Sequence, residues 1–285
     1  MAIKVIVNGL PGKMATEVAN AVVSSPDFQL MPFSLTGPEI DLDSVEFGKN
    51  LGKISVDLIK PENRAYFLKY SNSLRSLIRF SEEQIVADFT HPSAVNENAT
   101  FYCDNEIPFV MGTTGGDRKA LEDRVRASGT SAVIAPNMAK QIVAFQAMMQ
   151  YAAENFPDVF KNYSLEIVES HQRGKADTSG TAKAMVGYFN ALGIPFAPDQ
   201  ISMVRNMKDQ LTIGVPQEHL SGHGWHTYTL KSEDGNTLFQ FTHNVNGRNI
   251  YAQGTLDAVR FLSERVKLGK TGRVYSMIDV LRESL

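Results

Sequence analysis

Short apolar runs alternate with segments of helical periodicity through the first half of the chain. Residues 3–7 form a continuous apolar run of the kind that makes a buried strand, and one helical face follows, with Ala15, Val18, Ala19 and Val22. Further strands are expected at 29–35, 53–59, 85–89, 108–111 and 132–134, with helices at 96–103 and 118–127. This alternation predicts a parallel, doubly wound sheet.

The pattern changes after Asn137. A helical stretch at 141–155 leads to an apolar run at 163–168, and a second helix has one apolar face, made by Ala182, Met185, Val186, Phe189 and Leu192. Runs at 200–204, 225–231 and 238–244 predict an antiparallel sheet, with a hairpin turn at Asp234-Gly235 between the last two. Helical spacing returns at 254–267, and we expect this tail to pack back on the first half.

Composition narrows the class of protein. The chain has 285 residues, 21% charged and 43% hydrophobic, and a net charge of −3. These values are typical of a soluble globular protein and predict neither a nucleic-acid nor a membrane partner. The N-terminus enters a strand at once, so the cytoplasm is the expected compartment, or the plastid stroma if a transit peptide has been removed. The single cysteine, Cys103, excludes an intrachain disulfide framework.

A glycine-rich turn follows the first strand. Gly9, Gly12 and Ala15 hold the first, fourth and seventh positions of a dinucleotide-binding fingerprint, although Pro11 stands where a glycine is usual. The start of the next helix would offer backbone N–H groups to a pyrophosphate, with Lys13 adding a positive charge. The turn therefore predicts a nicotinamide dinucleotide site.

The end of the second strand bears on which dinucleotide binds. The stretch Ser34-Leu35-Thr36-Gly37 has hydroxyls but no acid before Glu39. NAD-preferring sites usually place an acid here for the ribose hydroxyls. We therefore expect NADPH as the cofactor, with NADH as the alternative.

We predict from these patterns an α/β chain of two domains. A Rossmann-type, doubly wound parallel sheet occupies 1–137, with 251–285 packing back on it. An α+β domain with a mixed or antiparallel sheet, expected to bind the substrate, occupies 138–250. We expect hinges near 137–140 and 246–253, because hydride transfer needs the two domains to close on the ligands.

Candidate chemistry gathers in the stretch 169–182. His171 follows the apolar run as a candidate proton donor, Lys175 supplies a cation, and Ser179-Gly180-Thr181 opens a helix. An acid, a cation and the N–H groups of a helix start suit a small dianion that must receive a proton. The competing interpretations are a histidine that caps a strand end, a solvated lysine and a simple N-cap.

Other polar residues carry weaker signals. Zinc at His219, His223 and His226 is disfavoured, because Gly222 and Gly224 break any helix that would place the three on one face, so no metal is expected. His243 and Arg248 are expected just after the second hairpin strand, either at the substrate pocket or in a structural role. Asp88 is expected to end a strand.

Taken together, these segments resemble the 4-hydroxy-tetrahydrodipicolinate reductases, nicotinamide-dependent enzymes of lysine and diaminopimelate synthesis. The resemblance extends over nearly the whole chain and rests on the order and spacing of several motifs. Besides the glycine loop and 171–181, these are Asp88-Phe-Thr-His-Pro92, Gly112-Thr-Thr-Gly115 and Ala135-Pro-Asn-Met138, with 214–223 and 241–251 similar to the plant-type branch.

The resemblance implies roles for individual residues. The cofactor phosphates would be held by Gly9, Leu10, Pro11, Gly12, Lys13 and Met14. The rest of the cofactor would be contacted by Ser34, Thr36, Thr90, Gly112, Thr113, Thr114, Ala135, Pro136, Asn137 and Met138. His171 would donate the proton and Lys175 would bind substrate and assist protonation. A cyclic dicarboxylate would also contact Gln172, Ser179, Gly180 and Thr181, and a homo-oligomer, dimer or tetramer, is implied.

Two departures from the common bacterial pattern are visible. Gln172 stands where that form has a second histidine, and Asp177-Thr178-Ser179 lacks a proline before the Ser-Gly-Thr. Two alternative functions remain at this point. One is another two-domain dehydrogenase of the aspartate or homoserine type, although Cys103 lies in the wrong context for a nucleophile. The other is a nucleotide-binding redox sensor, which would need neither His171 nor Lys175.

Overall fold

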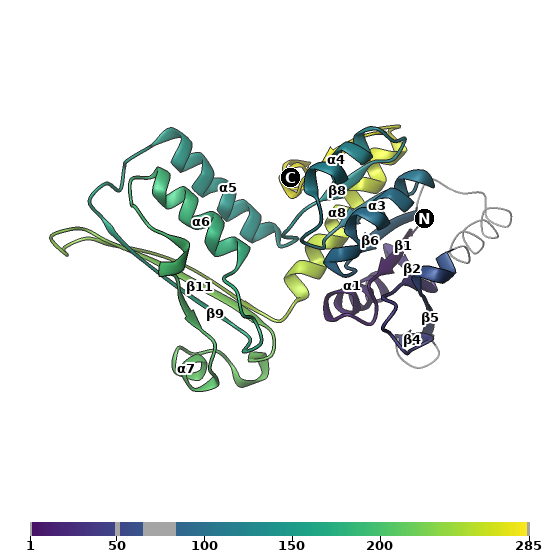
Figure 1. Ribbon diagram of the computed structural model, residues 1–285, viewed down its shortest axis with the longest axis horizontal. Helices are drawn as coiled ribbons and strands as arrows, with labels where there is room; N and C mark the ends of the chain where they lie inside the picture. The colour runs from purple at the N-terminus through teal and green to yellow at the C-terminus, as the bar shows by residue number, and fades with distance from the viewer. Residues whose placement is uncertain (1, 49–51, 65–83, 284–285) are drawn as a thin grey trace. The chain divides into compact units, whose positions relative to one another are not determined.

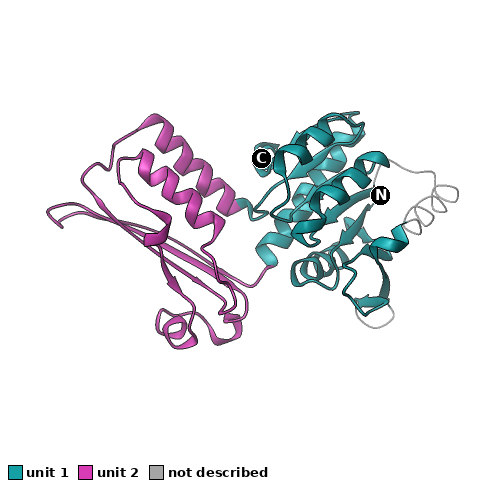
Figure 2. Cartoon of the chain, in the orientation of Figure 1, with its two compact units in different colours: residues 1–140, 249–285 teal, residues 141–248 magenta. Residues whose placement is uncertain are grey.

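The structure is a computed structural model that describes residues 2–48, 52–64 and 84–283. The chain forms two compact units, one of residues 1–140 with 249–285 and one of residues 141–248 (Figure 2). Within the described residues, no helix combines the length and the apolar character needed to span a membrane.

Six parallel strands form the main sheet of the first unit, in the order β13-β8-β7-β6-β1-β2 (Figure 1). Their bounds are β1 Ile3–Asn8, β2 Phe28–Leu30, β6 Gln84–Asp88, β7 Phe109–Met111, β8 Ala132–Ile134 and β13 Val274–Tyr275. The predicted parallel sheet is confirmed. Because β1 lies between β2 and β6, the winding reverses at β1, and ligands of such sheets bind at the carboxyl ends of the strands beside this point.

Helices cover this sheet. Helix α1 packs on α8 and α3 packs on α4, and α8 also lies against β6 and β7. The bounds are α1 Lys13–Val23, α3 Val95–Asp104, α4 Arg118–Arg126, α8 Asn249–Lys267 and α9 Met277–Glu283. The apolar stripe Ala15, Val18, Ala19 and Val22 is buried as its spacing predicts. Helix α8 returns the chain to the first unit, which is therefore discontinuous in sequence.

The prediction of a single strand at 29–35 is wrong. The segment forms two strands, β2 and β3 Phe33–Leu35, which belong to different sheets. Pro32 separates them, and proline has no N–H to continue a ladder. Strand β3 pairs in parallel with β5 Ile54–Ile59, which pairs with β4 Ser44–Phe47 in a separate three-stranded sheet. The strand expected at 53–59 is thus outside the main sheet.

The second unit has a four-stranded sheet in the order β10-β9-β11-β12. The strands are β9 Ser164–His171, β10 Ser202–Val204, β11 His223–Lys231 and β12 Leu238–Asn246. The hairpin of β11 and β12 around Asp234-Gly235 is confirmed. The antiparallel pairing expected for 200–204 is wrong, because β10 runs parallel to β9. The chain returns through helix α6, Gly180–Ala191, before it enters β10, and such a crossover makes neighbouring strands parallel.

Two long helices lie side by side over one face of this sheet, α5 Lys140–Asn155 and α6 Gly180–Ala191 (Figure 1). The core between helices and sheet includes Ile167, Phe189 and Tyr228. The predicted apolar face of α6 is buried along its length, including Leu192. Among the described residues, the remaining helices are α7 Met207–Thr212 and the short 3-10 turns Pro61–Asn63, Pro92–Ala94, Pro198–Gln200 and Gln217–His219.

Candidate functional site

The glycine turn of the first unit is built without room for side chains. Gly9 has φ +101°, and a Cβ there would lie 2.4 Å from the carbonyl oxygen of Phe89, at the end of the neighbouring strand β6. A Cβ on Gly12 would lie 2.7 Å from the oxygen of Gly9. Helix α1 begins directly after the turn, at Lys13, and its first N–H groups have no partner within the helix. The turn has the shape of a phosphate cradle.

The hydroxyls of Ser34 and Thr36 contact the backbone of this turn at Leu10. Ser34 Oγ accepts from the N–H of Leu10 at 3.4 Å, and Thr36 Oγ1 donates to the carbonyl of Leu10 at 2.6 Å. Ser34 is fully buried and Thr36 nearly so. Both hydroxyls therefore hold the backbone of the turn at Leu10.

A buried carboxylate organises the turn after β6. Asp88 Oδ1 accepts from the N–H of Thr90 at 2.9 Å and from its hydroxyl at 2.6 Å. Its Oδ2 accepts from Asn98 at 3.0 Å and from Tyr102 at 2.5 Å. Burial and the nearby Asp88 charge raise the pKa of Tyr102 well above its usual value. Asp88 ends its strand as expected, and it also fixes the conformation of Thr90.

The remaining predicted cofactor residues follow β7 and β8. Thr113 Oγ1 donates to the carbonyl of Thr90 at 2.9 Å, and a Cβ on Gly112 would overlap the ring of Phe89. Asn137 Oδ1 accepts from the N–H of Ala139 at 2.9 Å. Three others differ in exposure: Thr114 and Pro136 are exposed and Met138 is buried. The turns after β1, β6 and β7 thus meet at one edge of the sheet.

His171 is the last residue of β9, three residues beyond the expected end of that strand. Its Nδ1 lies 3.0 Å from the carbonyl oxygen of His223, so Nδ1 carries the proton that it donates there. The other nitrogen, Nε2, is buried without a hydrogen-bond partner. Burial first, and then the neighbouring His226, lower the pKa of His171 to about 4. The ring is therefore neutral at pH 7, with its Nε2 lone pair available.

The loop after His171 presents Lys175. Its Nζ donates to Asp177 Oδ1 at 2.8 Å, and its backbone N–H donates to the carbonyl of Gln172 at 3.0 Å. The Lys175 carbonyl accepts from Arg205 Nε at 2.9 Å. Lys175 thus pairs with a carboxylate of its own loop when no ligand is bound.

Ser179 is the N-cap of α6, as its place before the helical periodicity indicates. Its Oγ accepts from the N–H of Ala182 at 3.0 Å and lies 2.8 Å from His226 Nε2. Gly180 is exposed and a Cβ on it would meet no atom within 4 Å, so space is open beside the first turn of the helix. The N–H groups of Gly180 and Thr181 belong to that turn and suit an anion.

Sequence reasoning gave no role to two residues that tie this region together. Glu169 has a side chain with 0% exposure, and its carboxylate forms an ion pair with Arg205. Burial acts to raise the pKa of Glu169, but contacts from His226, the Ser179 N–H and Arg205 outweigh it and hold that pKa below its usual range. Glu169 comes two residues after Ile167 on the strand, so both lie on the same, buried face. This spacing is the sequence signal that could have identified Glu169 as a buried carboxylate.

The three histidines considered for zinc do not converge on one point. His223 Nε2 contacts Ser170 Oγ at 2.7 Å, whereas His226 Nε2 contacts Ser179 Oγ, and His219 lies in a 3-10 turn. Glu169, His171 and His226 do place potential ligand atoms within 4.8 Å of one another. The Arg205 guanidinium beside that carboxylate opposes a second cation, so we interpret the group as an ion-paired cluster.

Of the two residues expected just after the second hairpin strand, Arg248 lies there and His243 does not. His243 lies inside β12 rather than after it, and its ring stacks on that of His226 with centroids 4.6 Å apart. Arg248 follows β12, and a Cβ on Gly222 would lie 2.9 Å from its Nη1. Burial first, and then His226, lower the pKa of His243 to about 4.

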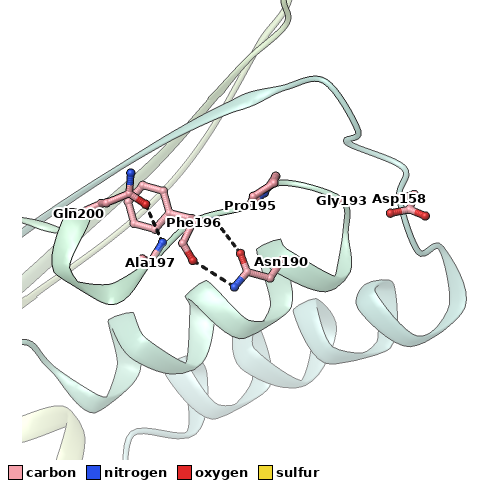
Figure 3. A pocket seen from close by; sticks show the side chains of 7 residues that line it. All are labelled: Asp158, Asn190, Gly193, Pro195, Phe196, Ala197 and Gln200. Atoms are coloured by element: carbon pink, nitrogen blue, oxygen red, sulfur yellow. Dashed lines mark hydrogen bonds between the residues drawn. The ribbon is translucent and has the colours of Figure 1, made fainter.

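A separate hollow follows the end of α6 (Figure 3). Gly193 turns the chain with φ +97°, and the side-chain amide of Asn190 holds both the N–H and the carbonyl of Phe196, at 2.8 and 3.1 Å. Asp158 is the titratable residue of its lining, and the hollow shares no residue with the His171 region. It carries none of the chemistry described above.

Comparison with known proteins identifies the relatives of this chain. The family models described as dihydrodipicolinate reductase, N-terminus and C-terminus, match residues 3–138 and 141–281. The 4-hydroxy-tetrahydrodipicolinate reductase 1, chloroplastic, of Arabidopsis thaliana is 45% identical over 99% of this chain and 78% of its own length. The probable reductase 2, chloroplastic, of Oryza sativa subsp. japonica is 44% identical over 98% of this chain and 83% of its own length. The dipicolinate-bound dihydrodipicolinate reductase of Paenisporosarcina sp. TG-14 shares the fold, with TM-score 0.62 and 20% identity over 97% of this chain and 98% of that one.

Proposed function

Since the chain belongs to the dihydrodipicolinate reductase family, we propose that it reduces 4-hydroxy-tetrahydrodipicolinate to tetrahydrodipicolinate, in lysine and diaminopimelate biosynthesis. Loss of water from the substrate gives a conjugated imine, which then takes up a hydride and a proton. A reduced nicotinamide supplies the hydride when bound. The observation that carries the proposal is the unpartnered Nε2 of His171 beside the Lys175 loop and the start of α6.

The first unit is proposed to hold the cofactor. Gly9 and Gly12 leave a cradle that a Cβ would fill, and α1 begins there with free N–H groups and Lys13. Thr90 and Thr113, held by Asp88 and by each other, are proposed to line the nicotinamide side. The residues present thus suit a dinucleotide.

A preference for NADPH is the finer part of this proposal. The ends of β3 and β5 are adjacent, because Thr36 donates its N–H to the carbonyl of Ile59 at 3.0 Å. Lys60 follows Ile59 directly, and we propose that its ammonium reaches a 2′-phosphate bound beside Thr36. Sequence reasoning missed Lys60 because the pairing of β3 with β5 was not predicted.

His171 is proposed to protonate the enamine carbon that remains after hydride addition. Its pKa of about 4 means that the ring must gain its proton as the substrate binds. Two incoming carboxylates supply the negative charge that favours the imidazolium. The ring would then hold a proton on Nε2, with Nδ1 fixed by the His223 carbonyl, and return to the neutral state after transfer.

The two carboxylates of the substrate are proposed to have separate partners. One would displace Asp177 from Lys175, and this exchange costs little because the Asp177 side chain is 74% exposed. The other would accept hydrogen bonds from the N–H groups of Gly180 and Thr181 and from the Thr181 hydroxyl. Gln172 is proposed to make a further polar contact with the substrate. Unlike the second histidine of the common bacterial form, its side chain cannot carry a positive charge.

The direct experiment follows nicotinamide absorbance with NADPH and the product of dihydrodipicolinate synthase. We expect His171→Gln to lower kcat by about two orders of magnitude while NADPH still binds, because a positioned acid contributes about that factor. Lys175→Ala should raise KM for the dicarboxylate. Unchanged turnover in His171→Gln would remove this residue from the mechanism.

The remaining proposals concern the whole chain. Residues 1–137 with 251–285 are proposed as the cofactor domain and 138–250 as the substrate and oligomerisation domain. The partner is a small dicarboxylate, and a dimer or tetramer is proposed from the family resemblance. The compartment is proposed as the cytoplasm or the plastid stroma, and the names of the plant relatives support the second.

A further inference from the structure

Glu169 connects three parts of the second unit. It precedes His171 by two residues on β9, so both side chains share one face of the strand. Its Oε2 accepts from the N–H of Ser179 at 3.0 Å and lies 3.9 Å from His171 Nε2 and 3.6 Å from His226 Nε2. Its Oε1 pairs with the guanidinium of Arg205. The carboxylate therefore joins the end of β9 to the N-cap of α6.

Arg205 extends this connection to the lysine loop. Its Nε donates to the carbonyl of Lys175 at 2.9 Å and its Nη2 to the carbonyl of Asp177 at 3.3 Å. Its Nη1 donates to the carbonyl of Glu169 at 3.3 Å. Arg205 follows β10, which is paired with β9 up to Ser170, and its side chain is only 17% exposed. One partly buried guanidinium thus fixes the backbone of the loop that presents Lys175.

We propose that Glu169 and Arg205 are positioning residues whose ion pair holds His171, the Lys175 loop and the start of α6 as one unit that fits the dicarboxylate. The inference rests on the proposed function, because the dicarboxylate gives these three parts a common ligand. The pair orders the site in two ways. Arg205 supplies geometry through several hydrogen bonds, and Glu169 supplies geometry together with a negative charge beside Nε2 of His171.

The contribution of geometry and the contribution of the Glu169 charge can be distinguished by their effects on the pKa of His171, which depends on the groups around it. Glu169 comes from the same strand, His223 and His226 from β11, His243 from β12 and Arg205 from the end of β10. Burial is the largest influence and lowers the pKa of His171, as do His226 and Arg205, whereas Glu169 raises it. Removing the Glu169 charge should therefore make His171 harder to protonate, an effect that a purely structural role would not produce.

The test measures two quantities with dipicolinate, a flat cyclic dicarboxylate, as the probe. Nitrogen-15 NMR of the imidazole gives the titration midpoint of His171 in the saturated complex, and calorimetry gives the Kd. We expect Glu169→Gln to lower the midpoint by about one pH unit and to raise the Kd roughly tenfold. The control Glu154→Gln, which removes an exposed carboxylate on α5, should change neither.

Arg205→Lys isolates the geometry. The charge stays, but an ammonium cannot reach the carbonyls of Lys175, Asp177 and Glu169 together. We expect a roughly tenfold higher Kd for dipicolinate with an unchanged His171 midpoint. An unchanged midpoint in folded Glu169→Gln, or an unchanged Kd in Arg205→Lys, would overturn the proposal. If Glu169→Gln does not fold, the Kd of dipicolinate for Arg205→Lys decides whether the proposal stands.

Failure of this inference can be told apart from failure of the proposed function. Neither readout involves turnover. A chain that binds dipicolinate with the expected variant effects but does not oxidise NADPH would contradict the proposed function and leave the positioning role supported. If the Arg205→Lys and Glu169→Gln variants reduce the substrate at the wild-type rate, the positioning role is contradicted and the proposed function is supported.

Discussion

Lys60 is the residue on which the proposed NADPH preference depends. It follows β5 beside Thr36, where the adjacent chain has hydroxyls and no acid before Glu39. A lysine ammonium gains a charge-assisted hydrogen bond with a phosphate but not with a ribose hydroxyl of the same strength. We therefore propose that Lys60 favours NADPH over NADH.

We predict that Lys60→Gln raises KM for NADPH about tenfold and leaves KM for NADH nearly unchanged, which steady-state kinetics with both cofactors would show. The matched control is Lys53→Gln, which precedes the same strand and pairs with Glu46 at the surface. Equal changes in both KM values would contradict a phosphate contact at Lys60.

Single residues of the site were predictable where local pattern marks them. His171 follows an apolar run and Ser179 precedes a helical face, so both were found. Glu169 and Arg205 were not given roles, because β9 was expected to end at Val168 and because Arg205 reaches the loop only through the pairing of β10 with β9. Contacts between residues far apart in sequence leave no periodic signal.

At the scale of elements, the periodicity of apolar residues predicted the main strands and helices. It did not predict correctly which strands pair with each other. The strand expected at 29–35 was divided at Pro32, and 200–204 proved parallel to its neighbour. Both errors concern which strand lies beside which. Apolar periodicity reports burial of a face, but the order of strands depends on connections across the whole unit.

The glycine turn between β1 and α1 gives a prediction at this scale. Gly9→Ala should weaken NADPH binding at least tenfold, because φ is +101° and the new Cβ would lie 2.4 Å from the Phe89 oxygen. Calorimetric titration with NADPH measures this. The control Gly187→Ala, on the exposed side of α6 with no atom within 4 Å of the new Cβ, should leave NADPH binding unchanged. Normal affinity in Gly9→Ala would refute the cradle.

At the scale of the whole molecule, each unit has its own core and its own part of the proposed site. The first has the glycine cradle, and the second has the histidine, the lysine loop and the helix start. The second unit also contains two partly buried histidines, His171 and His243, whose lowered pKa values make its stability depend on pH. Their pKa values lie below that of a histidine in an unfolded chain.

We predict that stability falls as the pH drops from about 6.5 to about 4. The pKa values of His171 and His243 are lowered to about 4, so over this interval the unfolded chain binds protons that the folded chain does not. The free energy of unfolding therefore decreases as pH decreases, by at most about 3 kcal/mol for each histidine. Urea denaturation at pH 7 and 4.5 measures the difference.

His243→Gln should reduce this pH dependence, because one of the two neutral histidines no longer titrates. His91→Gln, at an exposed histidine of the first unit, should leave it as in the wild type. The same loss of stability in His243→Gln and in the wild type would show that His243 titrates normally in the folded state.

The most direct test of the whole account is proton uptake when dipicolinate binds. Calorimetry at pH 7 in two buffers of different ionisation enthalpy gives the number of protons taken up. We predict an uptake approaching one proton in the wild type, because His171 is neutral before the dianion arrives and charged afterwards, and little uptake in His171→Gln. Equal uptake in both proteins, or none in the wild type, would contradict His171 as the group that carries the proton.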